Sequence, residues 1–384
     1  MSEFIRRFSS FCNYADALVR RLNRIMTLRS LYLQHFRNYE EAYLEFSPQF
    51  NLICGPNAKG KTTLLEAIHC LMIGRSFRTS HYPDLIQQQF ESFFLEAQFY
   101  KHGIEQTLKF GFHTTDRKII YNSTPLATLS NLLGLIPGVI ITPDDVQLVK
   151  GSPQLRRQFL DIQIAQVDPL YVHHLNRYGR ALKQRNHLLK MKQQISIDSW
   201  EQEMTHSAAY LIQQRYQTIT HLQNLAQKYY HLLSGENDLL TLEYRSIANS
   251  NLSIDEIKKL LVKQLCKNRQ REMQIGYTLS GPHKDDLFVA IGGRDIRYFA
   301  SEGQQRSCVN ALHFAEWSRL HQRGDGDFPL FMIDDIGMSL DSNRKDRLVE
   351  QLQSVGQVFL TTTDPKFLDH IDADKKIFTL PFYN

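Results

Sequence analysis

The first third of the chain is patterned in short runs in which apolar and polar residues alternate. These runs cover residues 31–36, 43–46, 50–54, 93–100, 105–112 and 118–121. Successive side chains of a strand point to opposite faces, so each run predicts a β-strand with one face or both faces buried. The sequence therefore predicts a lobe rich in strands before residue 126.

From about residue 152 the apolar residues recur every three or four positions, which predicts helices. Asp168 and Pro169 mark a helix start, because Asp caps the first turn and Pro lacks an N–H that this turn leaves unpaired. One apolar stripe follows this start, and after a break near 195–198 a second stripe runs to residue 232. The two stripes predict an antiparallel helix pair, and an arm of about 25 residues would be about 37 Å long.

Strand character returns after the helical stripes. The predicted strands lie at 277–279 and 287–291, and the remaining chain alternates between strand and helix patterns. This order predicts an α/β architecture that is interrupted in sequence by a helical lobe.

Composition narrows the class of protein. Of the 384 residues, 42% are hydrophobic and 22% are charged, which excludes a disordered chain and a disulfide-bonded miniprotein. The net charge of +5 favours anionic partners. The five cysteines are scattered and odd in number, and no apolar run reaches the length of a membrane helix. We expect a cytoplasmic protein with reduced thiols that does not bind a membrane.

A phosphate-binding loop follows the predicted strand at 50–54. The loop reads Gly55, Pro56, Asn57, Ala58, Lys59, Gly60, Lys61, Thr62, and Thr63 continues it into a helical pattern. Its glycines allow backbone N–H groups to surround phosphates, Lys61 reaches the β- and γ-phosphates, and Thr62 coordinates Mg²⁺. The expected cofactors are therefore ATP and Mg²⁺.

Two carboxylates, Asp334 and Asp335, end an apolar strand pattern at 330–333. The carboxyl ends of parallel strands meet at one edge of a sheet, where nucleotides bind. We therefore expect Asp334 to hold Mg²⁺ and Asp335 to be the catalytic residue that orients the attacking water.

A third motif spans 301–306 and opens a helical pattern. Ser301 and Gln304 have the spacing of a capping box. Together with the loop and the two acids, this segment resembles the signature sequence of ATP-binding-cassette (ABC) ATPases. The segment 336–341 follows the acids as that family's next loop does, and the resemblance places Asp341 in a loop that crosses a dimer interface.

Further segments make the chain resemble the bacterial RecF recombination mediators, compact relatives of the chromosome-maintenance ATPases. These segments are 36–39, 55–68, 74–79, 149–153, 156–157, 281–286, 301–306 and 334–341. The resemblance implies an α/β fold: an ABC-type P-loop ATPase head with an inserted helical lobe that carries a short antiparallel helical arm.

The resemblance also implies how the chain is divided. The ATPase lobe would comprise 26–125 and 276–384, and the helical lobe would comprise 126–275. Residues 1–25 form a basic extension with no counterpart in the family, which makes Met26 an alternative start.

Homodimer formation on ATP binding follows from the same resemblance. The residues expected to contact ATP beside the loop are Arg37, Asn38, Thr63, Ser301, Gly303 and Gln304. The last three would cover the ATP of a second subunit, so that ATP joins the two heads. Glu302 departs from the family pattern, because it places an acid close to phosphate.

The implied partner is DNA with a gap or a junction between single strand and duplex. Candidate phosphate contacts are Arg75, Arg78, Lys150, Arg156 and Arg157. The resemblance implies that RecR- and RecO-like partners assist this protein in placing recombinase on single strands, with weak, DNA-stimulated ATP hydrolysis.

Other functions share these motifs. A transporter's nucleotide-binding subunit normally has its acids much closer to the P-loop, and a chromosome-organising structural ATPase needs far longer arms. A nucleotide-gated scaffold that scarcely hydrolyses ATP stays open as an alternative, because Asp335 is shorter than the Glu common at this position in related ATPases.

Overall fold

The computed structural model describes residues 26–114, 116–324, 327–336, 342–367, 369, 371 and 373–381. The extension at 1–25 and the predicted interface residue Asp341 lie outside the described residues. The chain divides into two compact units: unit 1 holds residues up to Pro143 and from Leu320 onward, and unit 2 holds Asp144–Arg319. The domain boundaries expected from the resemblance, at 126 and 275, stay predictions.

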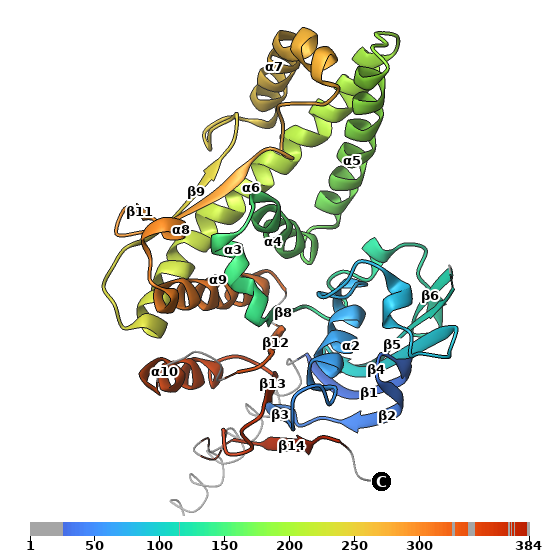
Figure 1. Cartoon of the computed structure of the whole chain (residues 1–384), viewed down its shortest axis with the longest axis vertical. Coiled ribbons are helices and arrows are strands. Elements are labelled where there is room, and N and C mark those ends of the chain that lie inside the picture. The colour runs from blue at the N-terminus through green and yellow to red at the C-terminus, as the bar shows by residue number, and fades with distance from the viewer. Residues whose placement is uncertain are drawn as a thin grey trace, which may run out of the picture. The chain divides into compact units, whose positions relative to one another are not determined.

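One layer of unit 1 is an antiparallel sheet of six strands in the order β2-β1-β4-β5-β6-β7 (Figure 1). Its strands are β1 (Thr27–Phe36), β2 (Tyr39–Glu45), β4 (Ser92–Lys101), β5 (Ile104–His113), β6 (Asp116–Tyr121) and β7 (Thr124–Pro125). Burial alternates along β4, where Phe93, Leu95 and Phe99 are buried between more exposed neighbours. Five of the six strand runs predicted in the first third of the chain, all but 50–54, overlap one of these strands.

The second layer of unit 1 is a parallel sheet of five strands in the order β14-β3-β13-β12-β8. The strands are β3 (Phe50–Cys54), β8 (Gly138–Ile141), β12 (Leu330–Ile333), β13 (Val358–Thr362) and β14 (Lys375–Thr379). Every residue of β3, β12 and β13 is buried, as is typical of parallel strands that are covered on both faces. Because β13 lies between β3 and β12, the segments that follow these two strands emerge at the same edge.

Helix α2 (Lys61–Ile73) leads away from this edge and is buried on all sides. Of its residues, only Thr62 is not buried. It contacts β4 of one sheet and β13 of the other. A helix with mostly apolar residues after its first turn is stable in such an interior position, and this position fixes the start of α2 at the sheet edge. The other α-helix that lies wholly in unit 1 within the described residues is α10 (Ser342–Leu352), and short 3-10 helices lie at Tyr82–Leu85 and Leu129–Asn131.

Unit 2 consists mainly of helices, with a small antiparallel sheet in the order β11-β10-β9. Its helices are α3 (Val146–Lys150), α4 (Pro153–Ala165), α5 (Pro169–Lys190), α6 (Ile197–Ser234), α7 (Ile254–Ile275), α8 (Ile296–Phe299) and α9 (Glu302–Arg323), whose last residues belong to unit 1. Its strands are β9 (Leu240–Arg245), β10 (Asp286–Ile291) and β11 (Arg294–Asp295). Among the described residues, no helix is both long enough and apolar enough to cross a membrane.

The predicted antiparallel helix pair is confirmed as α5 and α6, which lie side by side (Figure 1). Asp168 caps α5 by accepting a hydrogen bond from the Tyr171 N–H, and Pro169 is the first helical residue. Helix α6 has 38 residues and is therefore about 57 Å long, longer than the predicted arm. Where the predicted apolar stripe is interrupted, the buried side of α6 carries Arg215, which donates to Asp161.

The strand predicted at 277–279 is wrong. The Thr278 N–H donates to Asn186 Oδ1 at 2.8 Å, and the Leu279 N–H donates to Glu272 Oε1 at 2.7 Å. These side chains accept the hydrogen bonds that a neighbouring strand would otherwise accept. The strand predicted at 287–291 is confirmed as β10.

Candidate functional site

The predicted phosphate-binding loop curves around the start of α2. Gly60 has φ of 97°, a conformation that favours glycine. A side chain at this position would also collide with the Asn38 amide and the Tyr39 ring, which lie 2.7 and 2.8 Å from the place of its Cβ. The turn between β1 and β2 therefore supports the loop, and it places Asn38 beside Gly60.

Lys61 directs its ammonium group into this loop. Its Nζ donates to the carbonyl oxygens of Gly55 at 2.7 Å and Pro56 at 3.0 Å, and to Asn57 Oδ1 at 3.4 Å. In the described structure no side chain caps α2, so the first N–H groups of the helix stay available to an anion. The ammonium group and the helix start together favour the binding of phosphate.

Asp334 lies at the end of β12 and connects the ends of two other elements. Its carboxylate accepts hydrogen bonds from the Thr62 hydroxyl at 2.9 Å and the Thr361 hydroxyl at 2.7 Å. Burial raises the pKa of Asp334, and the charge of Asp335 acts in the same direction. A cation at this place would offset the cost of burying the carboxylate.

The oxygen atoms of Thr62 and Asp334 fit Mg²⁺. This ion prefers hard oxygen ligands, and it commonly takes one or two from the protein beside phosphate oxygens and water. The Thr62 hydroxyl and the Asp334 carboxylate lie next to each other at the start of α2. The metal role of these two residues stays a prediction.

Asp335 faces a pocket of about 590 Å³, a size that is typical of small-ligand sites. Its backbone is left-handed with φ of 56°, and its N–H donates to the Thr361 hydroxyl at 2.6 Å. The predicted residues that line the pocket are Arg37, Asn38, Asn57, Ala58, Gly60, Lys61, Thr62, Thr63, Asp334 and Asp335. Gly55, Pro56 and Lys59 complete the loop outside this lining.

Sequence patterns did not indicate Glu66, a fully buried residue of α2 that holds two arginines at the pocket. Arg37 donates to its two carboxylate oxygens at 2.7 and 3.0 Å. Arg78 lies 3.5 Å from the same carboxylate, to which the Ser76 hydroxyl also donates. Arg78, a candidate DNA contact, therefore lies at the nucleotide pocket. A Glu on the apolar side of the P-loop helix was a usable signal, because buried carboxylates are almost always paired.

Replacing Glu66 is expected to destabilise unit 1. Glu66→Gln removes the negative charge that two guanidinium groups share, and it should lower the free energy of unfolding by about 2 kcal/mol. Arg78→Gln is the matched control, because Arg78 is half-exposed, and it should cost less than about 1 kcal/mol. Urea titration of both variants measures the difference. An equal decrease in the free energy of unfolding of both variants would contradict the inference that Glu66 holds both arginines.

The signature residues lie in unit 2, at the start of α9. Ser301 and Gln304 form the capping box that their spacing predicts: the Gln304 N–H donates to Ser301 Oγ at 3.2 Å, and the Ser301 N–H donates to Gln304 Oε1 at 3.0 Å. Gln304 also donates to Glu236 at 2.9 Å. Arg306 pairs with the unexpected acid Glu302 at 2.9 Å. Ser301 is exposed and Gly303 is half-buried, so both can be reached from solvent.

The predicted DNA contacts have different surroundings. Arg75 and Lys150 are exposed. Arg156 is buried and donates to both carboxylate oxygens of Asp286, which removes it from the surface that a phosphate contact requires. Arg157 is half-buried and donates to the Asp285 carbonyl oxygen at 2.8 Å. Of the candidates in unit 2, Lys150 alone presents an exposed charge.

Comparison with known proteins agrees with this geometry. The family model described as RecF/RecN/SMC N terminal domain matches residues 27–380. The DNA replication and repair protein RecF of Chlamydia abortus is 38% identical over 338 residues, which cover 88% of this chain and 92% of that protein.

Solved structures give the same assignment. A structure of the recombination mediator protein RecF-ATPrS in the RecFOR pathway is 29% identical, with a TM-score of 0.86 over 93% of this chain and 96% of that chain. An Smc head domain from Pyrococcus furiosus is similar in fold, with 18% identity and a TM-score of 0.55 over 92% of this chain and 93% of that chain. The chain therefore has the fold of an ABC-type ATPase head and belongs to the RecF family.

Proposed function

We propose that this chain is a cytoplasmic, ATP-dependent DNA-binding recombination mediator of DNA repair and replication restart. The observation that best supports the proposal is the assembly of Lys61, Thr62, Asp334 and Asp335 at the edge of one sheet in a RecF-family chain. ATP binding joins two subunits, and the dimer binds gapped or junction DNA. RecR- and RecO-like partners then act with it to load recombinase.

The residues of the pocket have separate roles in this proposal. Lys61 and the start of α2 neutralise phosphate charge, and Arg37 and Arg78 add positive charge that Glu66 keeps in place. Thr62 and Asp334 hold Mg²⁺, which neutralises charge on the phosphate oxygens when it is bound. Asp335 orients the water molecule that attacks the terminal phosphate.

The signature serves the ATP of the second subunit. Ser301 and Gly303 open a capped helix, whose start attracts the γ-phosphate. The acid at Glu302 does not cancel this attraction, because Arg306 neutralises it one turn later. ATP thus lies between the P-loop of one subunit and the signature of the other.

A mixture of two inactive variants tests this arrangement. Lys61→Ala removes the P-loop lysine, and Ser301→Arg blocks the signature. In a mixed dimer the defective P-loop faces the blocked signature, and the intact P-loop faces the intact signature, so one of the two sites is undamaged. Because neither variant should dimerise with itself, the dimers that form in the mixture have one intact site of two, and ATPase activity should return to at most about half of the wild-type level. Each variant alone is the control. No recovery in a mixture with proven mixed dimers would contradict the shared site.

Hydrolysis is expected to be weak and to be stimulated by DNA. ATP turnover measured with and without gapped DNA tests this point directly. A protein that binds ATP and DNA without turnover in either condition would instead be a nucleotide-gated scaffold.

A further inference from the structure

Helix α7 presents two chemically different faces. Ile257, Leu261 and Leu265 follow one another at four-residue spacing, and each has at most 2% of its surface exposed. Helix α7 packs against α6 and α5. These contacts fix which side of α7 faces the interior of unit 2.

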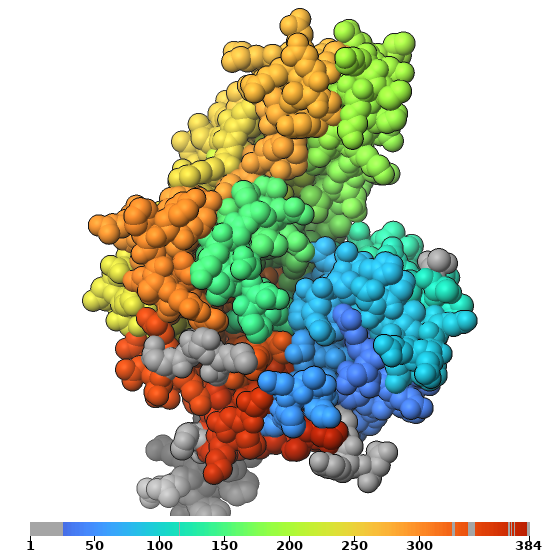
Figure 2. Space-filling view, viewed as in Figure 1, coloured from blue at the N-terminus to red at the C-terminus, as the bar shows by residue number. Residues whose placement is uncertain are grey.

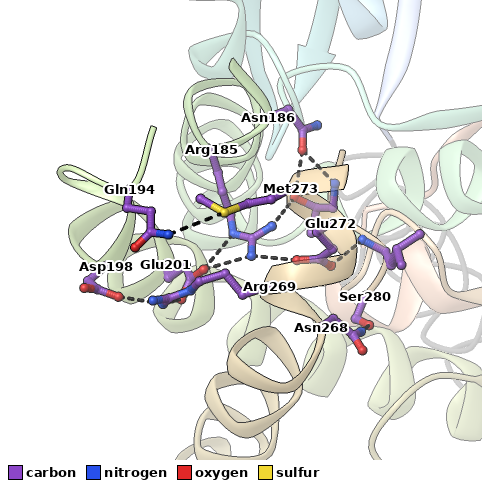
Figure 3. A network of polar contacts seen from close by, with 12 residues as sticks. Arg185, Asn186, Gln194, Asp198, Glu201, Asn268, Arg269, Glu272, Met273 and Ser280 are labelled. Atoms are coloured by element: carbon purple, nitrogen blue, oxygen red, sulfur yellow. Dashed lines mark hydrogen bonds and ion pairs between the residues drawn. The ribbon is translucent and has the colours of Figure 1, made fainter. Parts of the chain in front are cut away.

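Charged residues near the end of α7 strengthen the same contact (Figure 3). Glu272 is fully buried and accepts a hydrogen bond from Arg185 of α5 at 2.7 Å. Arg269 pairs with Glu201 and Asp198 of α6. Figure 3 shows these side chains converging between the three helices. The network fixes which side of α7 faces the interior of unit 2. The charges on this inner side of α7 are compensated within unit 2.

The opposite face carries a row of cations. We name Lys259, Lys263, Lys267 and Arg271 the α7 basic row; all four are exposed. They repeat at four-residue spacing and are offset by two residues from the buried apolar positions, which is about 200° around a helix. The four charges therefore lie at intervals of about 6 Å over a length of about 18 Å.

Beyond its first residue, Lys259, the charge of the row is not balanced by acids of α7. Among the described residues, none forms a hydrogen bond or an ion pair with any of the four side chains. Two acids precede the row on α7: Asp255 lies four residues before Lys259, and Glu256, which the capping Ser253 engages, lies three residues before it. The next acid on the helix is the buried Glu272, so Lys263 and Lys267 have no acid of α7 within one turn. Figure 2 shows the gold-to-orange surface of α7 uncovered in this view.

The composition of this face favours a nucleic-acid backbone as its partner. A helix face that only meets solvent usually interleaves both signs of charge, which form pairs one turn apart. Protein interfaces are depleted in Lys and rely on buried aromatic anchors, and α7 has no aromatic residue. A regular row of Lys and Arg matches a chain of phosphates instead.

We infer that the α7 basic row binds the sugar-phosphate backbone of DNA without reading its sequence. This inference rests on the proposed DNA-binding function and names a surface for it. It also explains how unit 2 contributes to DNA binding although Arg156 is buried. The exposed cations of the row take the role that the sequence assigned to Arg156, which is buried.

A salt titration tests the row. The probe is fluorescent gapped DNA with the full-length protein and ATP, and the variant is Lys263→Gln/Lys267→Gln. Losing two phosphate contacts per subunit should flatten the log–log salt slope by about 1.8 for each subunit on the DNA, about 3.6 for a dimer. The control is Lys118→Gln/Lys228→Gln, which removes the same charge from exposed lysines of β6 and α6 and should leave the slope unchanged.

The possible outcomes separate the inference from the function on which it rests. Wild-type protein that fails to bind DNA with ATP contradicts the proposed function. Wild-type protein that binds, with an unchanged slope in the row variant, overturns the inference alone. Loss of binding to a RecR- or RecO-like protein with unchanged DNA binding makes the row a protein interface and also overturns it. If the first variant unfolds at a lower temperature, Lys259→Gln/Arg271→Gln repeats the test.

Discussion

Lys61→Ala is expected to abolish ATP binding and ATP-dependent dimerisation. The Lys61 ammonium group lies in the curve of the loop, within 3.0 Å of two backbone carbonyl oxygens. Without it, the charge of the β- and γ-phosphates stays uncompensated when a second head approaches. Light scattering with and without ATP should show dimers of the wild-type protein and monomers of the variant.

Lys59→Ala is the matched control for this loss. Lys59 belongs to the same loop, but its side chain is exposed and does not line the pocket. Removing it changes the net charge by the same amount and should leave dimerisation intact. Dimers of the Lys61 variant as abundant as those of the wild type would refute the assigned role.

Asp335→Asn is expected to separate binding from turnover. The amide preserves the shape of the side chain but cannot orient water as a carboxylate does, so turnover should fall by about a hundredfold or more while ATP still joins two subunits. Single-turnover hydrolysis and light scattering measure the two properties in the same samples.

Asp334→Asn serves as the contrasting variant. Asp334 accepts hydrogen bonds from Thr62 and Thr361, so its replacement should weaken Mg²⁺-dependent ATP binding itself. If Asp335→Asn weakens binding as much as it slows turnover, the two acids have been assigned to the wrong roles.

The parts of the site that the sequence predicts well depend on neighbours along the chain. The run at 50–54 is buried strand β3, and the loop after it leads directly into α2. The capping box at Ser301 and the cap at Asp168 each join residues three positions apart. Such short-range contacts can be predicted from the sequence, because the strand, loop and helix patterns follow one another directly along the chain.

The parts that the sequence predicts poorly depend on side chains outside the local pattern, which lie 7 to 130 positions away. Arg156 looks like a surface arginine, but its carboxylate partner Asp286 lies 130 positions later. Arg78 lies at the nucleotide pocket, where it forms an ion pair with the buried Glu66. The predicted strand at 277–279 is replaced by hydrogen bonds to Asn186 and Glu272. In each case the partner lies outside the segment from which the prediction was made, and only Glu66, a carboxylate on the apolar side of a helix, gave a usable signal.

The uninterrupted length of α6 has a mechanical consequence. Just beyond its carboxyl end, Glu236 accepts a hydrogen bond from the signature residue Gln304, and near its amino end Glu201 binds Arg269 of α7. A stiff helix about 57 Å long acts as a lever: a tilt of about 5° at one end moves the other end by about 5 Å. A small displacement of the signature helix, when it is carried by α6, would therefore reach α7 as a movement nearly as large as the spacing of its cations.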